Sequence, residues 1–226
     1  MGRQCYERWV QKEIIQVEES AIRVVLPMGY GGESSRRYPL LIMLTPDLDV
    51  TESLRTLHSE GVLPEMIVAT LLGKSSLDDP AALVPILSGK FQLLDSPAAR
   101  WIVGTGHSAV TAMNAVLDHP GMFGKGAFLS TSFEGIEGAP PLHSPVLRSL
   151  EERAIFPKNT RLFFDYGTVG LDECYEPYHR DLGAILRGKG WKDGRGFQIK
   201  RSPGGSHDPD SWGMRLVPAL RWLASH

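Results

Sequence analysis

One serine lies where a buried strand is expected to turn directly into a helix. The segment that begins at Trp101 runs WIVGTGHSAVTAMNA, an apolar start followed by small residues and then by a helical pattern. Residues 106–110 match the nucleophile elbow Gly-x-Ser-x-Gly except at the last position, where Val110 replaces glycine. Such a turn exposes the serine oxygen and directs helix N–H groups at an oxygen that becomes negative. The segment therefore predicts Ser108 as a nucleophile.

Two other interpretations fit the same residues. The stretch from Gly104 to Ala109 also matches the dinucleotide-binding fingerprint G-x-G-x-x-G/A. That fingerprint normally begins its fold, with an acid at the end of the next strand, whereas here several strands come first and Glu134 is the acid in reach. The third interpretation is a glycine-rich turn with Ser108 as a helix cap and no chemistry. The elbow alone leaves function and plain structure evenly matched.

An acid and a histidine follow later strands in the order that a hydrolase triad needs. Enzymes with a nucleophile elbow place nucleophile, acid and histidine in this chain order, at the carboxyl ends of successive strands. Asp172 lies in a loop after the strand expected at 162–164, and His207 lies in the loop after the strand expected at 197–199. Three matches in order favour a triad of Ser108, Asp172 and His207 over a solvated loop histidine beside an unrelated acid.

Three acids compete for the middle position of this triad. Asp165 directly follows its strand, so its side chain is expected to point into the sheet. The glycines of 167–170 let the chain turn toward His207 before it reaches Asp172. Glu173 is expected to point elsewhere at the start of a helix, where acids are common for electrostatic reasons alone. We therefore expect Asp172 to be the acid.

Several short segments, spread over most of the chain, resemble one enzyme family. They are Ile22–Tyr30, Arg37–Leu44, Gly106–Ala109, His119–Gly124 and Gly205–His207, with Trp212 downstream. They resemble the esterase group of α/β hydrolases that includes the enterochelin esterases and esterase D. The resemblance implies a carboxylic ester hydrolase without a cofactor, in which Ser108 is the nucleophile, Asp172 orients the histidine and His207 is the general base.

The chain departs from this family at two places near the nucleophile. Val110 stands where a glycine usually lets helix and strand approach closely. Pro46 follows the expected strand 40–44 and has no N–H, so the second oxyanion donor is expected from Asp47 or Leu48. The first donor is expected to be the N–H of Ala109, because the residue after the nucleophile supplies one in this architecture.

The elements expected around these residues alternate between strand and helix. Two short strands, 13–17 and 21–26, have the pattern of an antiparallel pair. Buried parallel strands are expected at 40–44, 66–72, 101–103, 127–129, 162–164 and 197–199. Helices are expected at 53–58, 108–117, 146–154, 177–187 and 210–223, the last kinked or split by Pro218. This alternation predicts an α/β fold with a mostly parallel sheet and helices on both faces.

Composition excludes several other classes of protein. The 226 residues are 42% hydrophobic, and 24 Lys and Arg stand against 26 Asp and Glu, with no basic run for nucleic acid. We find neither an apolar leader nor a run of about 18 apolar residues for a membrane span. Cys5 and Cys174 suit free thiols in a reducing compartment, so a cytoplasmic location is expected. The histidines outside the elbow and the proposed triad show no metal-ligand spacing, so no metal site is expected.

These observations combine into one prediction for residues 1–226. We expect a single α/β-hydrolase domain that cleaves a small carboxylic ester through an acyl-enzyme. The short stretch 130–160 predicts no large lid domain and an open pocket, with Phe133 and Trp212 as its apolar wall, although both aromatics would also suit the core. The alternatives are a noncatalytic binding protein of the same fold and, more distantly, a dinucleotide-dependent oxidoreductase. A homo-oligomer is compatible with the sequence, which does not specify the acyl group or the alcohol.

Overall fold

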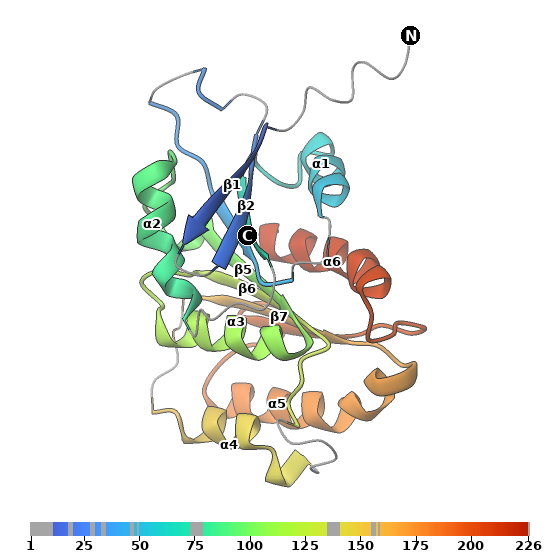
Figure 1. Cartoon of the computed structure of the whole chain (residues 1–226). Helices are drawn as coiled ribbons and strands as arrows, with labels where there is room; N and C mark the ends of the chain where they lie inside the picture. The colour runs from blue at the N-terminus through green and yellow to red at the C-terminus, as the bar shows by residue number, and fades with distance from the viewer. Residues whose placement is uncertain are drawn as a thin grey trace.

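The fold is built on a central β-sheet. The computed structural model describes residues 11–17, 20–27, 30–32, 35–45, 48, 50–72, 79–134, 141–154, 157 and 159–225. Within these ranges the strands are β1 (Gln11–Val17), β2 (Ser20–Leu26), β3 (Leu40–Met43), β4 (Ile67–Leu72), β5 (Arg100–Thr105), β6 (Lys125–Leu129), β7 (Arg161–Tyr166) and β8 (Phe197–Arg201). They form one sheet in the order β1-β2-β4-β3-β5-β6-β7-β8 (Figure 1). All the expected strands are therefore present.

The strand directions follow from the hydrophobic pattern. β1 and β2 form an antiparallel hairpin, and β2 also pairs antiparallel with β4. From β4 through β8 every neighbouring pair is parallel. Every residue of β3 and β5 is buried, as strands covered on both faces require, whereas β2 alternates between buried and half-buried positions. The strand order differs from the 3-2-1-4-5-6 order of dinucleotide-binding folds.

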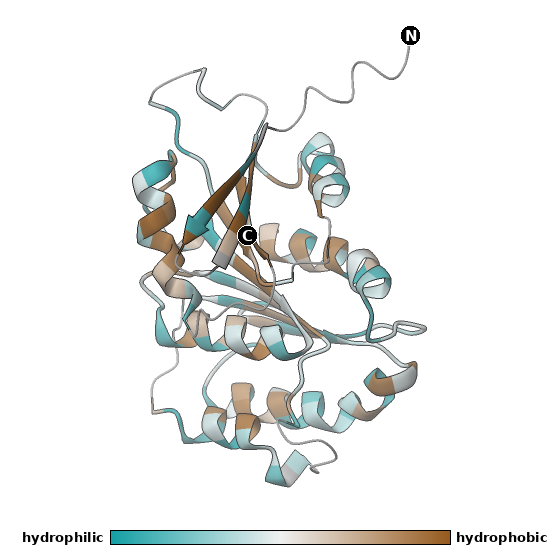
Figure 2. Cartoon of the chain, in the orientation of Figure 1, coloured by the Kyte–Doolittle hydropathy of each residue, from teal (hydrophilic) through white to brown (hydrophobic). Residues whose placement is uncertain are grey.

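Helices cover both faces of the sheet. They are α1 (Thr51–Ser59), α2 (Leu83–Lys90), α3 (Gly106–Asp118), α4 (Pro145–Glu152), α5 (Glu176–Gly188) and α6 (Pro209–Ala224). In Figure 1, α2, α3, α4 and α5 lie on one side and α1 and α6 on the other. Each side has its own apolar core, and Figure 2 shows brown, hydrophobic stretches in helices of both sides, among them α2, α5 and α6.

The helices differ from the expected ones in three respects. α2 was not expected, because Pro85 and Gly89 interrupt its pattern. α6 continues through Pro218 as one helix, so it is not split. α3 begins at Gly106, two residues before the expected start at Ser108. That last difference changes which residue lies at the strand-to-helix turn.

The segment between β6 and β7 is short, as expected. Its described residues contain a single 3₁₀ turn at Pro141–His143 and the helix α4, which packs against α5. The described part of this segment therefore adds no lid domain to the sheet, and the predicted α/β fold, with a mostly parallel sheet and helices on both faces, is confirmed.

Candidate active site

The turn between β5 and α3 is made by Gly106. The strand ends at Thr105 and the helix begins at the next residue, with no loop between them. Gly106 is buried and has a φ of 54°, in the left-handed region that side-chain-bearing residues seldom adopt. In a nucleophile elbow, the residue at this sharp turn is the nucleophile itself.

Small residues on either side of Gly106 bring strand and helix into contact. A Cβ added to Gly104 would lie 2.3 Å from the backbone oxygen of Ser108. Positions 104 and 108 therefore do what the first and last glycines of the elbow pattern do. Residues 104–108 align with the pattern Gly-x-Ser-x-Gly, with Gly106 at the place of the serine and Ser108 at the place of the last glycine. Val110 lies beyond the pattern, so its branched side chain creates no crowding at the turn.

Ser108 itself is the third residue of α3. Its Oγ donates a hydrogen bond to the carbonyl of Thr105 (2.9 Å) and accepts one from the N–H of the same residue (3.0 Å). The Thr105 side chain accepts in turn from the Ser108 N–H, which completes a capping box. Within the described part of the chain, no hydrogen bond joins Ser108 to His207. The hydroxyl of Ser108 is therefore engaged at the cap of its own helix and not with the predicted base.

Asp172 and His207 do come together. The Nδ1 of His207 donates to Asp172 Oδ1 over 2.8 Å, and the Asp172 side chain is fully buried whereas that of His207 is 21% exposed. This bond leaves Nε2 as the free side of the imidazole. A Cβ added to Gly106 would lie 3.0 Å from that Nε2. The dyad thus faces the strand-to-helix turn at Gly106.

The other two candidate acids have different surroundings. Glu173 is exposed to solvent. Asp165 is buried and pairs with Arg215 over 3.1 Å. Burial raises the pKa of Asp165 to about 6, although the guanidinium opposes this rise. Of the three acids, Asp172 is the one that contacts His207.

Hydrogen bonds hold Asp172 in its charged form. Burial alone would raise the pKa of this carboxyl, but bonds from His207, from the Ser130 hydroxyl (2.5 Å) and from the Gly167 N–H (2.7 Å) outweigh it and keep the pKa below its usual value. Ionised Asp172 fixes the proton of His207 on Nδ1. Nε2 is then the nitrogen that can accept a proton.

Arg215 and Ser130 complete a network that the sequence analysis missed. Arg215 is 6% exposed and donates to Ser130 Oγ (2.8 Å) and to the carbonyl of Ser206 (2.8 Å). It also lies 3.3 Å from Asp172 Oδ2. Ser130 has a φ of 46°, unusual for a residue other than glycine. One signal was available, because Arg215 is a charged residue on the apolar face of α6.

The two predicted pocket aromatics have different roles. Trp212 donates its indole N–H to Ser130 Oγ (3.0 Å), and its ring meets the imidazole of His207 edge to face at 5.0 Å. Phe133 is completely buried against Phe164 and His179. It belongs to the core and cannot line an open pocket, so that prediction is corrected.

The predicted oxyanion donors also change. Ala109 is the fourth residue of α3, and helix geometry commits its N–H to the carbonyl of the capping residue Thr105. The N–H of Leu48 donates to the Thr45 carbonyl (3.3 Å), and Asp47 lies outside the described residues, as does Pro46. The N–H of His107 follows the turn directly and takes part in no intrahelical bond. It stands where the first oxyanion donor of an elbow stands.

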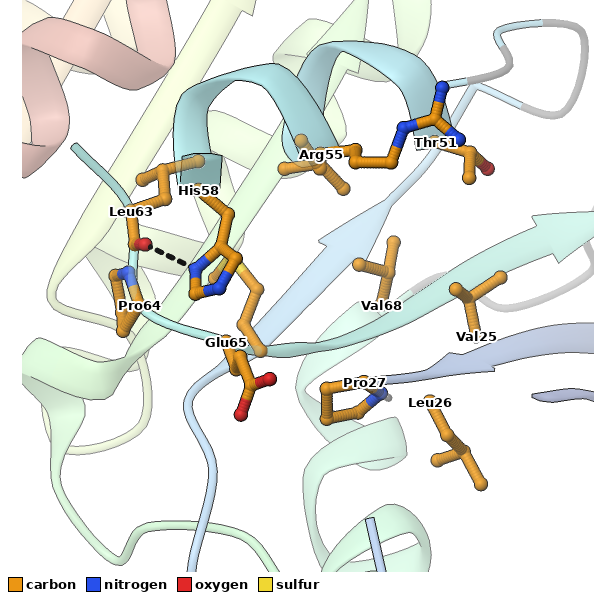
Figure 3. A pocket seen from close by; sticks show the side chains of 12 residues that line it. Val25, Leu26, Pro27, Thr51, Arg55, His58, Leu63, Pro64, Glu65 and Val68 are labelled. Atoms are coloured by element: carbon orange, nitrogen blue, oxygen red, sulfur yellow. Dashed lines mark hydrogen bonds between the residues drawn. The ribbon is translucent and has the colours of Figure 1, made fainter. Parts of the chain in front are cut away.

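An apolar pocket lies on the α1 side of the sheet, away from the dyad. Figure 3 shows it between α1, β2 and β4, with His58 Nδ1 bonded to the carbonyl of Leu63 (3.0 Å). Leu63–Met66 precede β4, so this pocket lies at the amino end of that strand. The dyad instead follows the carboxyl ends of β7 and β8. The pocket is therefore separate from the candidate active site.

Two kinds of feature are absent from the described ranges. No group of three or more His, Cys, Asp or Glu side chains there is arranged to hold a metal ion. No helix there is long and apolar enough to cross a membrane. Cys174 is an exposed free thiol, and Cys5 lies outside these ranges.

Known proteins match this chain in structure only. No protein-family model and no curated protein matches it. A ferulic acid esterase aligns over 95% of this chain and 97% of its own, with a TM-score of 0.75 and 18% identity. Ferric enterobactin esterase from Salmonella typhimurium aligns over 95% of this chain with a TM-score of 0.76 and 18% identity, and this chain spans 57% of that protein. S-formylglutathione hydrolase from Staphylococcus aureus aligns over 96% of each chain, with a TM-score of 0.68 and 16% identity. The chain therefore has the α/β-hydrolase fold of these esterases.

Proposed function

We propose that this chain hydrolyses a small carboxylic ester, with His207 as general base and Asp172 as the residue that orients it. The observation that carries the proposal is the bond of 2.8 Å between His207 Nδ1 and Asp172, together with the position of Nε2 beside Gly106 at the start of α3. A carboxylate-bound histidine with one free nitrogen, next to a helix N-terminus, suits attack on a carbonyl group.

The proposed chemistry divides among three groups. His207 Nε2 accepts the proton of the oxygen that attacks the ester carbonyl, and later returns it to the departing alcohol. Asp172 keeps Nδ1 protonated and stabilises the imidazolium that forms. The N–H of His107 and the positive end of the α3 dipole stabilise the oxyanion. Ser130 and Arg215 hold Asp172 in place and touch no reacting atom.

The fold neighbours support this assignment at the level of reaction class. A ferulic acid esterase, an enterobactin esterase and S-formylglutathione hydrolase are all named for cleaving an ester or a thioester. We propose a small-molecule ester as the partner of this chain, on the same grounds. We also propose a cytoplasmic location, because two cysteines without a disulfide framework suit a reducing compartment.

Noncatalytic binding is the second candidate. Gly106 favours it, because the residue at the turn has no hydroxyl to form an acyl-enzyme. A protein of this kind would retain a carboxylic ester or acid at the helix N-terminus without cleaving it. The two candidates differ in a single measurable property, the release of alcohol from the bound ester.

The test compares two histidine substitutions in an aryl acetate hydrolysis assay. His207→Ala should abolish the hydrolysis that the unaltered protein adds to the buffer rate, because the general base is lost. His143→Ala is the matched control, since His143 is exposed and lies outside the site, and its rate should equal that of the unaltered protein. Equal rates for His207→Ala and the unaltered protein would refute the proposal. Binding of the ester without any turnover would favour the noncatalytic candidate.

A further inference from the structure

The position facing the general base is occupied by a residue without a side chain. A Cβ added to Gly106 would have His207 Nε2 at 3.0 Å, His207 Cε1 at 3.5 Å and Ser132 Oγ at 3.9 Å as its nearest neighbours. A side chain at position 106 would therefore begin in contact with the free nitrogen of the dyad. At 3.0 Å the imidazole must give way by a few tenths of an ångström, and a hydroxyl on that side chain would then lie beside Nε2.

Neighbouring hydroxyls are engaged elsewhere. Ser108 Oγ uses its proton on the Thr105 carbonyl and accepts from the N–H of the same residue. Ser132 is 5% exposed, and its Oγ lies 3.4 Å from the hydroxyl of Tyr175. A serine activated by a histidine instead donates its proton to that histidine. Neither serine has this arrangement.

We infer that position 106 is the nucleophile position of this site and that glycine leaves the attack to a water molecule. The inference rests on the proposed function for the identity of the substrate, an ester, but its assignment of position 106 rests on geometry alone. It replaces Ser108 as the expected nucleophile. The consequence is a hydrolase site with a base, an orienting acid and an oxyanion donor, but without a covalent intermediate.

The reaction balances with one water and one ester. The water oxygen bonds to the carbonyl carbon while its proton moves to His207 Nε2, and the carbonyl electron pair moves onto the oxygen beside the His107 N–H. The tetrahedral intermediate then collapses, and the bond from the carbonyl carbon to the alcohol oxygen breaks. The proton on His207 passes to that oxygen. The products are one carboxylic acid and one alcohol.

This route selects esters with good leaving groups. A serine nucleophile would divide the hydrolysis into two acyl transfers through an acyl-enzyme, whereas water must displace the alcohol in a single acyl transfer. The expected substrates are therefore aryl esters, enol esters and thioesters, whose leaving groups depart as weak bases. Alkyl esters of simple alcohols should be poor substrates.

The test restores the missing side chain. Gly106→Ser should react stoichiometrically with a fluorophosphonate probe and release a burst of phenol from an aryl ester equal to the enzyme concentration. Peptide mapping by mass spectrometry should find the adduct on residue 106. Gly106→Ser combined with Ser108→Ala should label equally well. The same serine combined with His207→Ala should not label, because the base is lost.

Two further arms use glycine and alanine at the same position. The unaltered protein should form no adduct and show no burst. Gly106→Ala should lose at least tenfold in any hydrolysis that the unaltered protein shows, because its methyl group takes the place of the attacking water beside Nε2. Thermal unfolding of each variant checks that the strained φ at position 106 is tolerated.

The outcomes separate this inference from the proposed function. An adduct on Ser108 or Ser132 of the unaltered protein would overturn the inference while leaving ester hydrolysis intact, and this arm does not depend on any variant. A folded Gly106→Ser variant that shows neither adduct nor burst would also overturn it. Labelling of Gly106→Ser together with an unaltered protein that hydrolyses no ester would support the assignment of position 106, overturn the attack by water and reject hydrolysis as the function.

Discussion

At the scale of single residues, the fully buried carboxylate of Asp172 is held by several hydrogen bonds and an ion pair. His207, Ser130 and the Gly167 N–H donate to it, and Arg215 lies within 3.3 Å. A buried charge with this many partners has one orientation and one protonation state. Because His207 Nδ1 donates to this carboxylate, the imidazole is also held in one orientation, with its Nε2 facing the strand-to-helix turn.

Replacing this carboxylate should therefore affect the rate more than the fold. Asp172→Asn should lower kcat for ester hydrolysis by as much as about 10⁴-fold, because the neutral amide permits the wrong histidine tautomer. Glu173→Gln is the matched control one residue away, and its exposed side chain predicts an unchanged kcat. Steady-state kinetics on an aryl ester measures both. A crippled Glu173→Gln beside a nearly normal Asp172→Asn would reverse the assignment of the acid.

At the scale of elements, the close approach of β5 and α3 builds the turn. Gly104 on the strand faces the backbone of Ser108 on the helix, at a separation that leaves no room for a methyl group. The approach directs the N-terminus of α3 toward His207. Gly104 and Gly106 together therefore position the N-terminus of α3.

A methyl group at Gly104 should break this arrangement. Its Cβ would lie 2.3 Å from a backbone oxygen, which cannot move without shifting the helix, so Gly104→Ala should lower the free energy of unfolding by about 3 kcal/mol or more. Gly121→Ala is the control, because a Cβ there meets nothing within 4 Å, and it should change stability by less than about 0.5 kcal/mol. Urea denaturation measures both. Similar midpoints for the two variants would contradict the close packing.

At the scale of the whole molecule, stability depends on buried groups that resist a change of charge. His179 of α5 is buried among aromatic rings, with its Nδ1 bonded to the Tyr175 carbonyl (2.9 Å). Burial lowers its pKa to about 4. The folded state therefore keeps His179 neutral at pH values where the unfolded chain, with a pKa near 6.5, takes up a proton.

Acidification should consequently destabilise the protein through this histidine. The contribution is present in full above about pH 6.5 and is lost as the pH falls toward 4, by up to about 3 kcal/mol for a shift of this size. His179→Gln should lack this loss. Asp165 and Asp172 are present in both proteins, so the difference in unfolding free energy between them isolates His179. Urea titrations at pH 7, 5.5 and 4.5 measure it, and parallel pH profiles would disprove the assignment.

The sequence by itself predicted the architecture. It also predicted that Asp172 and His207, two of the three proposed triad residues, follow neighbouring strands. Runs of apolar residues that alternate between strand and helix periods depend on local hydrophobicity alone, so they predicted the sheet and most helices. The parallel arrangement then requires that loops after neighbouring strands meet at one edge. This is why the sequence predicts that Asp172 and His207 lie near each other, as their hydrogen bond confirms.

Only the tertiary structure decided the register of the elbow. The segment 104–110 offers two partial matches to the elbow pattern: 104–108 lacks the serine and the last glycine, and 106–110 has Val110 in place of the last glycine. The parallel pairing of β5 with β6 extends the strand to Thr105, which pairs with Leu129, so the helix must begin at Gly106. Hydrogen bonding across a sheet depends on residues distant in sequence, and no local pattern contains it. For the same reason Arg215 and Ser130 emerged as partners of Asp172 only when α6, β6 and the loop after β7 were packed together.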